Sequence, residues 1–204
     1  MRDLQKGDAP AFRWSRVAVH EAGHAVMAML LGLDVVECDI TRGRRGRGRS
    51  GRCVVVDPDP VGLRRFLVSM GGILAEHLVF GDDRGGGKDR EDAGVSLFVY
   101  SSKYRQKGSD PGAEAIILEV SELFREQASR TVLMDIASLL DRDGRVDGGR
   151  LLVSGNRIGE SLDISGIERK IAVFAEAVPA PGWKDMFLGW ISNIKEIIER
   201  IRGF

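Results

Sequence analysis

Near its amino end the sequence reads Val17-Ala18-Val19-His20-Glu21-Ala22-Gly23-His24-Ala25-Val26, with two histidines four residues apart. One turn of an α-helix takes about 3.6 residues, so His20 and His24 project from one face and can share a small cation. Two neutral imidazoles hold Zn²⁺ at roughly 2.0–2.1 Å, together with a third protein ligand and a water. Glu21 follows the first histidine and is placed to take a proton from such a water. The pattern therefore predicts a metal-dependent hydrolytic site.

The residues around this pattern favour a metal site over the alternatives. A short pattern of this kind occurs by chance in unrelated helices, and a histidine pair can also be a hydrogen-bonded part of a core. Here the helix is apolar on most sides, so its polar residues are predicted to enter the interior, where they are costly without a purpose. Ser15 is predicted to cap the helix, which should end near Gly32 and Leu33. The apolar residues are Ala18, Ala22, Ala25, Val26, Met29 and Leu30.

Composition sets the broad class. The chain has 204 residues, 43% hydrophobic and 29% charged, which is typical of a soluble globular protein of one or two domains. Its 30 basic and 30 acidic residues cancel, so net charge favours neither nucleic acid nor an anionic membrane. Cys38 and Cys53 are too few for a disulfide scaffold, and no signal peptide is recognisable, so we expect free thiols and a cytoplasmic location. The longest apolar run, residues 25–33, is too short to cross a bilayer.

Residues 35–40 and 53–56 are predicted to form a small β-hairpin, which Pro58 and Pro60 end. Its tip alternates arginine with glycine. Such a tip can follow the phosphates of single-stranded nucleic acid, but it has no aromatic residue for base stacking. We favour a long hairpin tip that its charges keep soluble over a tip that binds nucleic acid. A third interpretation is that the tip guides acidic peptides to the site. The arginines available to nucleic acid are Arg42, Arg44, Arg45, Arg47, Arg49 and Arg52.

Two further helices are predicted after the hairpin. The first covers residues 63–80, and because each glycine in a helix costs about 1 kcal/mol relative to alanine, Gly71-Gly72 indicates close packing against the histidine helix. The second begins at Asp89 after a glycine-rich loop, which lacks the Ser or Thr of a phosphate-binding loop; no such motif occurs in the chain. Spacing alone does not fix the third metal ligand, and Glu76, Asp89 and Asp92 are all candidates.

Three motifs follow one another along the chain: His20-Glu21-Ala22-Gly23-His24-Ala25, Gly71-Gly72-Ile73-Leu74-Ala75-Glu76-His77-Leu78-Val79-Phe80-Gly81 and Gly86-Gly87-Lys88-Asp89-Arg90-Glu91-Asp92-Ala93. In this order they resemble the peptidase domain of FtsH-type AAA zinc metalloproteases, over about Ser15 to Leu152. The resemblance implies that an aspartate opening a helix after a glycine-rich turn is the third zinc ligand, and Asp89 matches it. It leaves Glu76 as a group that supports a ligand. It also implies that the edge of the strand pair holds an extended substrate.

The chain departs from this family in two respects. His77 stands where the family commonly has another acidic residue, and we expect an ordinary surface or core histidine there. Family members also carry an ATP-driven unfoldase and a membrane anchor, and neither is recognisable in this sequence. The resemblance therefore implies either a peptidase for peptides and unfolded segments, served or not by a separate ATPase, or a zinc-fold adaptor that no longer cleaves. The retained Glu21 favours the peptidase.

The second half of the chain is predicted to be helical. Residues 113–140 carry enough apolar positions for two helices or one broken pair, and residues 141–147 are expected to be a polar turn, because they lack the spacing of a calcium loop. Another helix is predicted at residues 167–178. The last, residues 183–202, has an apolar face suited to packing or formation of a homo-oligomer, with binding to a membrane surface as the alternative.

The sequence thus predicts a mainly α fold, a helical zincin-like metallopeptidase domain with a small β-hairpin. We expect an N-terminal arm at residues 1–14, a metal-binding core at 15–110, a helical continuation at 111–152 and a C-terminal helical extension at 153–204. The predicted function is zinc-dependent endopeptidase, with Zn²⁺ held by His20, His24 and Asp89 and water activated by Glu21. A silent zinc-fold adaptor and a nucleic-acid-associated protein are the alternatives.

Overall fold

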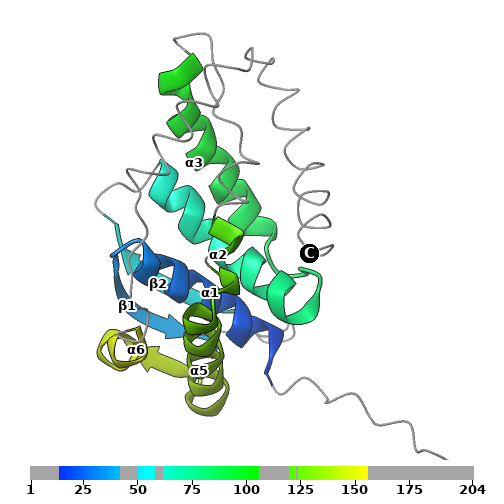
Figure 1. The fold of residues 1–204 in the computed structure, drawn as a ribbon, viewed down its shortest axis with the longest axis vertical. Helices are drawn as coiled ribbons and strands as arrows, with labels where there is room; N and C mark the ends of the chain where they lie inside the picture. The colour runs from blue at the N-terminus through cyan, green and yellow to red at the C-terminus, as the bar shows by residue number, and fades with distance from the viewer. Residues whose placement is uncertain (1–13, 42–49, 58–61, 106–119, 123, 156–204) are drawn as a thin grey trace, which may run out of the picture.

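A computed structural model gives the fold (Figure 1) and describes residues 14–41, 50–57, 62–105, 120–122 and 124–155. As predicted, the chain is mainly helical with a small β element. The elements in order are α1 (Arg16–Leu30), β1 (Asp34–Asp39), β2 (Arg52–Val56), α2 (Leu63–Phe80), α3 (Gly87–Arg105), α5 (Gln127–Asp143), β3 (Arg145–Asp147) and α6 (Gly148–Gly155).

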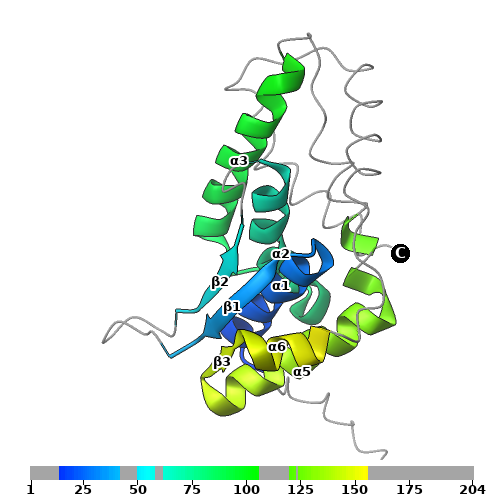
Figure 2. The ribbon, with the colours of Figure 1, turned by 90° about the vertical axis from the view of Figure 1, so that its left-hand side faces the viewer.

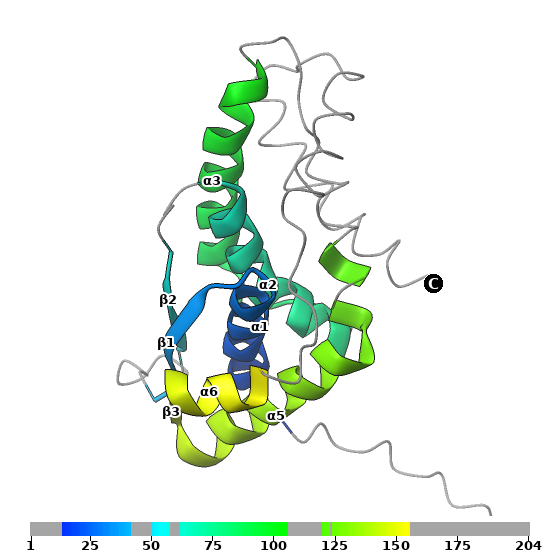
Figure 3. The same ribbon diagram turned by 60° about the vertical axis from the view of Figure 1, so that its left-hand side comes forward.

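Helix α1 lies at the centre of the described residues. It contacts α2 and α5, and strands β1 and β2 pass along its other side (Figure 3). Every residue from Ala18 to Ala28 is buried, which explains why the sequence of this helix is apolar on most sides. Ser15 caps the helix as predicted, because its side chain accepts from the Ala18 N–H. The Ser15 N–H in turn donates to Asp141 of α5 at 2.7 Å, so the start of α1 is fixed to a distant helix.

Two glycines let α1 and α2 cross at close range. A Cβ atom built on Gly71 would lie 2.6 Å from the Gly23 carbonyl oxygen, and one built on Gly23 would meet the Gly71 carbonyl oxygen and lie 2.5 Å from Ala75 Cβ. These obstacles are backbone atoms and a short side chain, so they can yield only if a helix moves. The prediction that Gly71-Gly72 packs closely against the histidine helix is confirmed, because Gly72 also lies against side chains of α1.

We expect Gly23→Ala to lower the free energy of unfolding by about 2 kcal/mol, as overpacking of a core does. Alanine gains about 1 kcal/mol of helix propensity over glycine, but the added methyl forces the two helices apart, and the second effect is larger. Urea denaturation measures the change. The control is Gly87→Ala at the start of α3, where a Cβ atom meets nothing within 4 Å and stability should not fall. An unchanged midpoint for Gly23→Ala would contradict the close crossing.

The sheet has three antiparallel strands in the order β2-β1-β3, so β2 lies at one edge. The third strand corrects a sequence prediction. Residues 141–147 were expected to be a polar turn, but α5 continues to Asp143, Gly144 ends it in the left-handed conformation at φ 74°, and β3 then pairs with β1. Val146 of β3 faces Cys38 of β1 and is 1% exposed, so burial of this side chain fixes the strand. Figure 2 shows β3 beside β1, close to α5 and α6.

Several predictions concern residues outside those described. They are the arm at 1–13, most of the arginine-glycine tip at 42–49, the first part of the helical segment at 113–119, and the helices at 167–178 and 183–202. Helix α3 begins at Gly87, two residues earlier than predicted. Among the helices that can be described, none is long and apolar enough to cross a membrane.

Candidate metal centre

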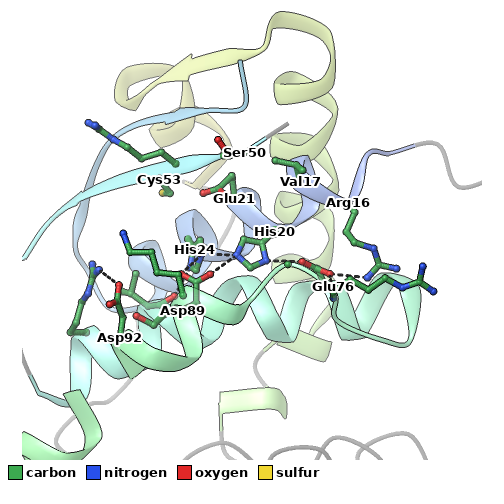
Figure 4. A pocket seen from close by; sticks show the side chains of 18 residues that line it. Arg16, Val17, His20, Glu21, His24, Ser50, Cys53, Glu76, Asp89 and Asp92 are labelled. Atoms are coloured by element: carbon green, nitrogen blue, oxygen red, sulfur yellow. Dashed lines mark hydrogen bonds and ion pairs between the residues drawn. The ribbon is translucent and has the colours of Figure 1, made fainter. Parts of the chain in front are cut away.

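Three polar side chains from two helices meet at one point (Figure 4). His20 and His24 come from adjacent turns of α1, and Asp89 comes from the first turn of α3. The two histidine Nε2 atoms lie 3.1 Å apart; Asp89 Oδ2 is 2.9 Å from His20 Nε2, and Asp89 Oδ1 is 3.4 Å from His24 Nε2. One ligand atom from each residue lies within 4.8 Å of the other two. The structure therefore brings together the three side chains that were predicted to hold a metal.

A hydrogen bond behind His24 sets the tautomer of its ring. His24 Nδ1 lies 2.7 Å from the carbonyl oxygen of Val68. Because a carbonyl only accepts, Nδ1 carries the proton and Nε2 presents a lone pair to the cluster. Burial, followed by the nearby charge of His20, lowers the pKa of His24 to about 4. At neutral pH His24 is thus a neutral imidazole, which is the form that binds a metal.

His20 lies between two carboxylates. Its Nδ1 donates to Glu76 Oε1 at 2.8 Å, while its Nε2 faces Asp89. Burial disfavours a charged ring, but the hydrogen bonds to Asp89 and Glu76 outweigh burial and raise the pKa of His20 to about 9. Burial likewise disfavours the Asp89 carboxylate, yet its hydrogen bond to His20 keeps the pKa of Asp89 below the usual value. The surroundings therefore favour positive charge at His20 Nε2, which a proton or a metal ion can supply.

Glu76 of α2 holds His20 from behind. It is fully buried and also accepts from Arg16 at 2.7 Å and from the backbone N–H of Arg84 at 3.0 Å. Arg16 is fixed in turn by Asp82, at 2.6 Å. Burial opposes ionisation of Glu76, but hydrogen bonds from His20, Arg16 and Arg84 lower its pKa. An ionised Glu76 keeps the proton on His20 Nδ1 and turns Nε2 toward the other two groups.

Gly72 leaves room beside both imidazoles. A Cβ atom at this position would lie 2.7 Å from His20 Nε2 and 2.8 Å from His24 Nε2. Any larger residue would therefore press on both of the atoms that face the candidate metal position. The two neighbouring glycines of α2 thus have different roles, since Gly71 permits the helix crossing and Gly72 makes space at the site.

Glu21 lies next to the cluster and is 5% exposed. Burial raises its pKa to about 7, although the nearby His20 and a hydrogen bond from the Cys53 N–H act in the opposite direction. Gly51 covers the same carboxylate, because a Cβ atom there would collide with Glu21 Oε1. A carboxylate with a pKa near neutrality can both take up and release a proton, as a general base must.

A pocket of about 550 Å³ opens onto these residues, between α1, α2, α3 and β2. Glu21, Cys53 and Ser50 lie on its β2 side, with His20, His24 and Asp89 opposite them (Figure 4). A pocket of this volume accepts a small ligand or part of a peptide. Its walls are formed by Arg16, Val17, His20, Glu21, His24, Ser50, Gly51, Arg52, Cys53, Arg65, Val68, Ser69, Glu76, Arg84, Gly85, Lys88, Asp89 and Asp92.

The donor set fits a divalent metal ion. Two imidazole nitrogens and one carboxylate are the protein ligands found in catalytic zinc sites, which keep a further position open to water or substrate. Here Gly72 places no side chain of its own against the two Nε2 atoms, and the pocket leads to the ligand atoms. The arrangement can therefore hold a metal ion in a place that a substrate reaches, with the Glu21 carboxylate beside it.

A family model described as Peptidase M50B-like matches residues 6–81. The match supports a metallopeptidase-family domain. It covers His20, Glu21, His24 and Glu76 but ends before Asp89, and it does not support assignment to the FtsH-type family in particular. No curated protein matches the chain.

The other two candidates for third ligand lie elsewhere. Glu76 contacts Nδ1 of His20, on the opposite side of the ring from the Nε2 atom that faces Asp89. Asp92 lies one turn beyond Asp89 on α3 and pairs with Arg65 at 3.3 Å. Neither belongs to the group of side chains whose ligand atoms converge.

Of the arginines considered for nucleic-acid binding, only Arg52 is among the described residues. It lies on β2 and pairs with Glu37 of β1 at 3.5 Å. Arg145 of β3 contacts the same glutamate, so Arg52 is part of an ion-pair cluster on the sheet. Nucleic-acid binding by the tip stays a prediction from the sequence.

Sequence reasoning missed the groups that hold Glu21 and the role of Gly72. The Cys53 N–H and Gly51 approach Glu21 only because the hairpin folds back over α1. No local sequence pattern predicts such a backbone donor. Gly72 carried a signal, the costly glycine pair in a helix, but that signal pointed equally well to helix packing.

We expect Glu76→Gln to weaken zinc binding about 10–100-fold, the usual effect of replacing a group that orients a metal ligand. The amide matches the carboxylate in shape but is neutral, so it holds the His20 proton less firmly. Competition with a chromogenic chelator measures the affinity. Glu91→Gln, which changes an exposed glutamate of α3, is the matched control and should bind zinc like the wild type. Equal affinities for the two variants would contradict the role given to Glu76.

Proposed function

We propose that this chain is a zinc-dependent endopeptidase that hydrolyses peptide bonds in peptides or unfolded protein segments. The observation that carries the proposal is the position of Glu21, a buried carboxylate with its pKa raised to about 7, beside the converging His20, His24 and Asp89. The match to a metallopeptidase family model supports the same class of reaction. From the order of the three sequence motifs we further propose that the domain is of the FtsH type.

Zinc is the metal that these ligands favour. Imidazole nitrogen and carboxylate oxygen suit Zn²⁺, whereas Mg²⁺ and Ca²⁺ prefer sites built from oxygen alone. The hydrogen bonds from His24 to Val68 and from His20 to Glu76 leave both Nε2 atoms free to bind. Bound zinc supplies a Lewis acid that polarises a peptide carbonyl and makes water easier to deprotonate.

Glu21 transfers the proton in the proposed reaction, and neighbouring residues hold it in position. Glu21 takes a proton from the attacking water and passes it to the leaving amine nitrogen. Its Cys53 hydrogen bond and the contact with Gly51 fix where the carboxylate lies during these transfers. Burial in the pocket wall excludes bulk water from Glu21 and thereby raises its pKa to about 7.

The substrate is proposed to lie extended along β2. This strand is an edge of the sheet, and residues 50–53 of the chain line the pocket beside Glu21. An extended peptide can add to such an edge through main-chain hydrogen bonds. Because only an unfolded segment can be extended in this way, folded proteins would need a separate ATPase to unfold them first.

Metal analysis combined with a cleavage assay tests the proposal. Purified protein should contain about one zinc per chain and should cleave casein or a quenched fluorescent peptide. A chelator should abolish cleavage, and added zinc should restore it. A folded, zinc-loaded protein that cleaves neither substrate would instead be a zinc-fold adaptor.

A further inference from the structure

Two thiols lie in contact in the wall of the pocket. Cys38 of β1 and Cys53 of β2 are direct partners in the antiparallel pair, and their Sγ atoms are 3.0 Å apart. Both are free thiols. Direct partners on neighbouring antiparallel strands have Cβ atoms about 4.5–5.5 Å apart, close to the separation that a disulfide spans. The sulfur atoms therefore need to approach by only about 1 Å to bond.

The two thiols differ in access. Cys38 is 0% exposed and belongs to the core, whereas Cys53 is partly exposed and lines the pocket. Figure 4 shows Cys53 beside Glu21, on the side of the pocket that faces the candidate metal ligands. A small reagent that enters the pocket thus meets Cys53 first and finds Cys38 directly behind it.

We propose that Cys38 and Cys53 form an oxidative modification site, at which a hydroperoxide oxidises Cys53 and Cys38 then closes a cross-strand disulfide. Nothing in the proposed hydrolysis uses either sulfur. The proposal stands on the contact between the two sulfur atoms and on the opening of the pocket onto only one of them.

The chemistry balances with hydrogen peroxide as the oxidant. The Cys53 sulfur attacks one peroxide oxygen, the O–O bond breaks, and the products are a Cys53 sulfenic acid and water. The Cys38 sulfur then attacks the Cys53 sulfur, the S–O bond breaks, and the hydroxide leaves as water with the Cys38 proton. Two thiols and one peroxide thus give one disulfide and two waters, and the two electrons lost by sulfur reduce the peroxide.

The surroundings of Cys53 slow its oxidation at neutral pH. The hydrogen bond with Cys38 and burial raise the pKa of the Cys53 thiol well above its usual range. Because the thiolate is the reactive form, oxidation should be slow at neutral pH and faster as pH rises.

The site also touches the proposed base. The Cys53 N–H donates to the Glu21 carboxylate, and Cys38 Sγ lies 3.8 Å from the Glu21 carbonyl oxygen. Closing the disulfide draws β2 toward β1 and moves the donor that positions Glu21. A misplacement of about 1 Å costs an enzyme up to about a hundredfold in rate. We therefore expect oxidation to lower the cleavage rate about tenfold or more, a consequence that rests on the proposed function.

Peptide mapping of the full chain tests the site itself. The reduced protein is treated with hydrogen peroxide, blocked with an alkylating reagent and digested with trypsin, which separates the two cysteines because Arg42 and Arg52 lie between them. We expect a linked Cys38–Cys53 peptide about 2 Da lighter than its two reduced parts, and its loss on treatment with dithiothreitol. Absence of the linked peptide, with both thiols alkylated or Cys53 oxidised further, would overturn the proposal.

Single variants test the order of the two steps. In Cys38→Ser the sulfenic acid of Cys53 has no partner and should be trapped by dimedone. In folded Cys53→Ser the buried Cys38 should not react with peroxide. In guanidinium, which unfolds both variants, the remaining cysteine of each should react, and this is the labelling control. Trapping at Cys38 in folded Cys53→Ser would overturn the order. In the cleavage assay, an unchanged rate in fully linked wild-type protein would refute the link to Glu21 and leave both the thiol site and the peptidase proposal standing.

Discussion

Replacing Glu21 with glutamine should lower kcat/KM for peptide cleavage by about 10²–10⁴-fold, the range that a positioned general base supplies. The zinc content should not change, because His20, His24 and Asp89 are untouched. The glutamine carbonyl can still accept from the Cys53 N–H, so the side chain keeps its place against Gly51. The loss therefore isolates proton transfer from metal binding. Initial rates with a quenched fluorescent peptide, together with metal analysis of the same samples, measure both quantities.

Thermal melting provides the control for this variant. Burial raises the pKa of Glu21 to about 7, so its ionised form is less stable in the folded protein than in the unfolded chain. That destabilisation begins above the pKa that Glu21 has in the unfolded chain, and it grows as pH rises toward the pKa that Glu21 has in the folded protein. Glutamine carries no charge at any pH, so the variant should melt at or above the wild-type temperature. Wild-type cleavage by Glu21→Gln would remove the proposed base, whereas a lower melting temperature would show that Glu21 is a structural residue.

The helices could be predicted from local sequence patterns, but only part of the sheet could be predicted in this way. The apolar faces of α1 and α2 and the cap at Ser15 depend on neighbours in the same segment, so sequence alone predicted them. Strand β3 has three residues, and only its pairing with the distant β1 makes Arg145–Asp147 a strand. A polar turn was the better interpretation of those residues without their partner, because so short a segment shows no alternation.

The same distinction applies to the candidate site. His20, Glu21 and His24 lie within one helix, and their geometry follows from the pitch of that helix. Asp89 comes from another helix, so its distance from the histidines depends on how α2 and α3 pack on α1. The resemblance selected Asp89, but the residues alone left Glu76 and Asp92 open. The contact of Cys53 with Cys38 depends on the register of the two strands, which no local sequence pattern fixes.

Three carboxylate variants should rank the candidates for third ligand by their effect on zinc affinity. Zinc sites in small domains bind with about 10–16 kcal/mol, so loss of one of three protein ligands removes roughly a third of this, about 3–5 kcal/mol. Asp89→Ala should thus weaken binding roughly 10²–10⁴-fold. Glu76→Gln should have the smaller effect expected of a group behind a ligand, and Asp92→Ala, which removes only the partner of Arg65, should have none.

Asp92→Ala is the matched control for Asp89→Ala, because both replace an aspartate on the same side of α3 that lines the same pocket. The two differ in one respect: Asp89 Oδ2 lies 2.9 Å from His20 Nε2, whereas Asp92 pairs with Arg65. If proximity to the pocket were enough to affect zinc, the two variants would lose affinity alike. A large loss in Asp89→Ala alone requires a direct bond from that carboxylate. Full affinity in Asp89→Ala, measured by chelator competition, would leave the two histidines without the third group on which the hydrolytic proposal depends.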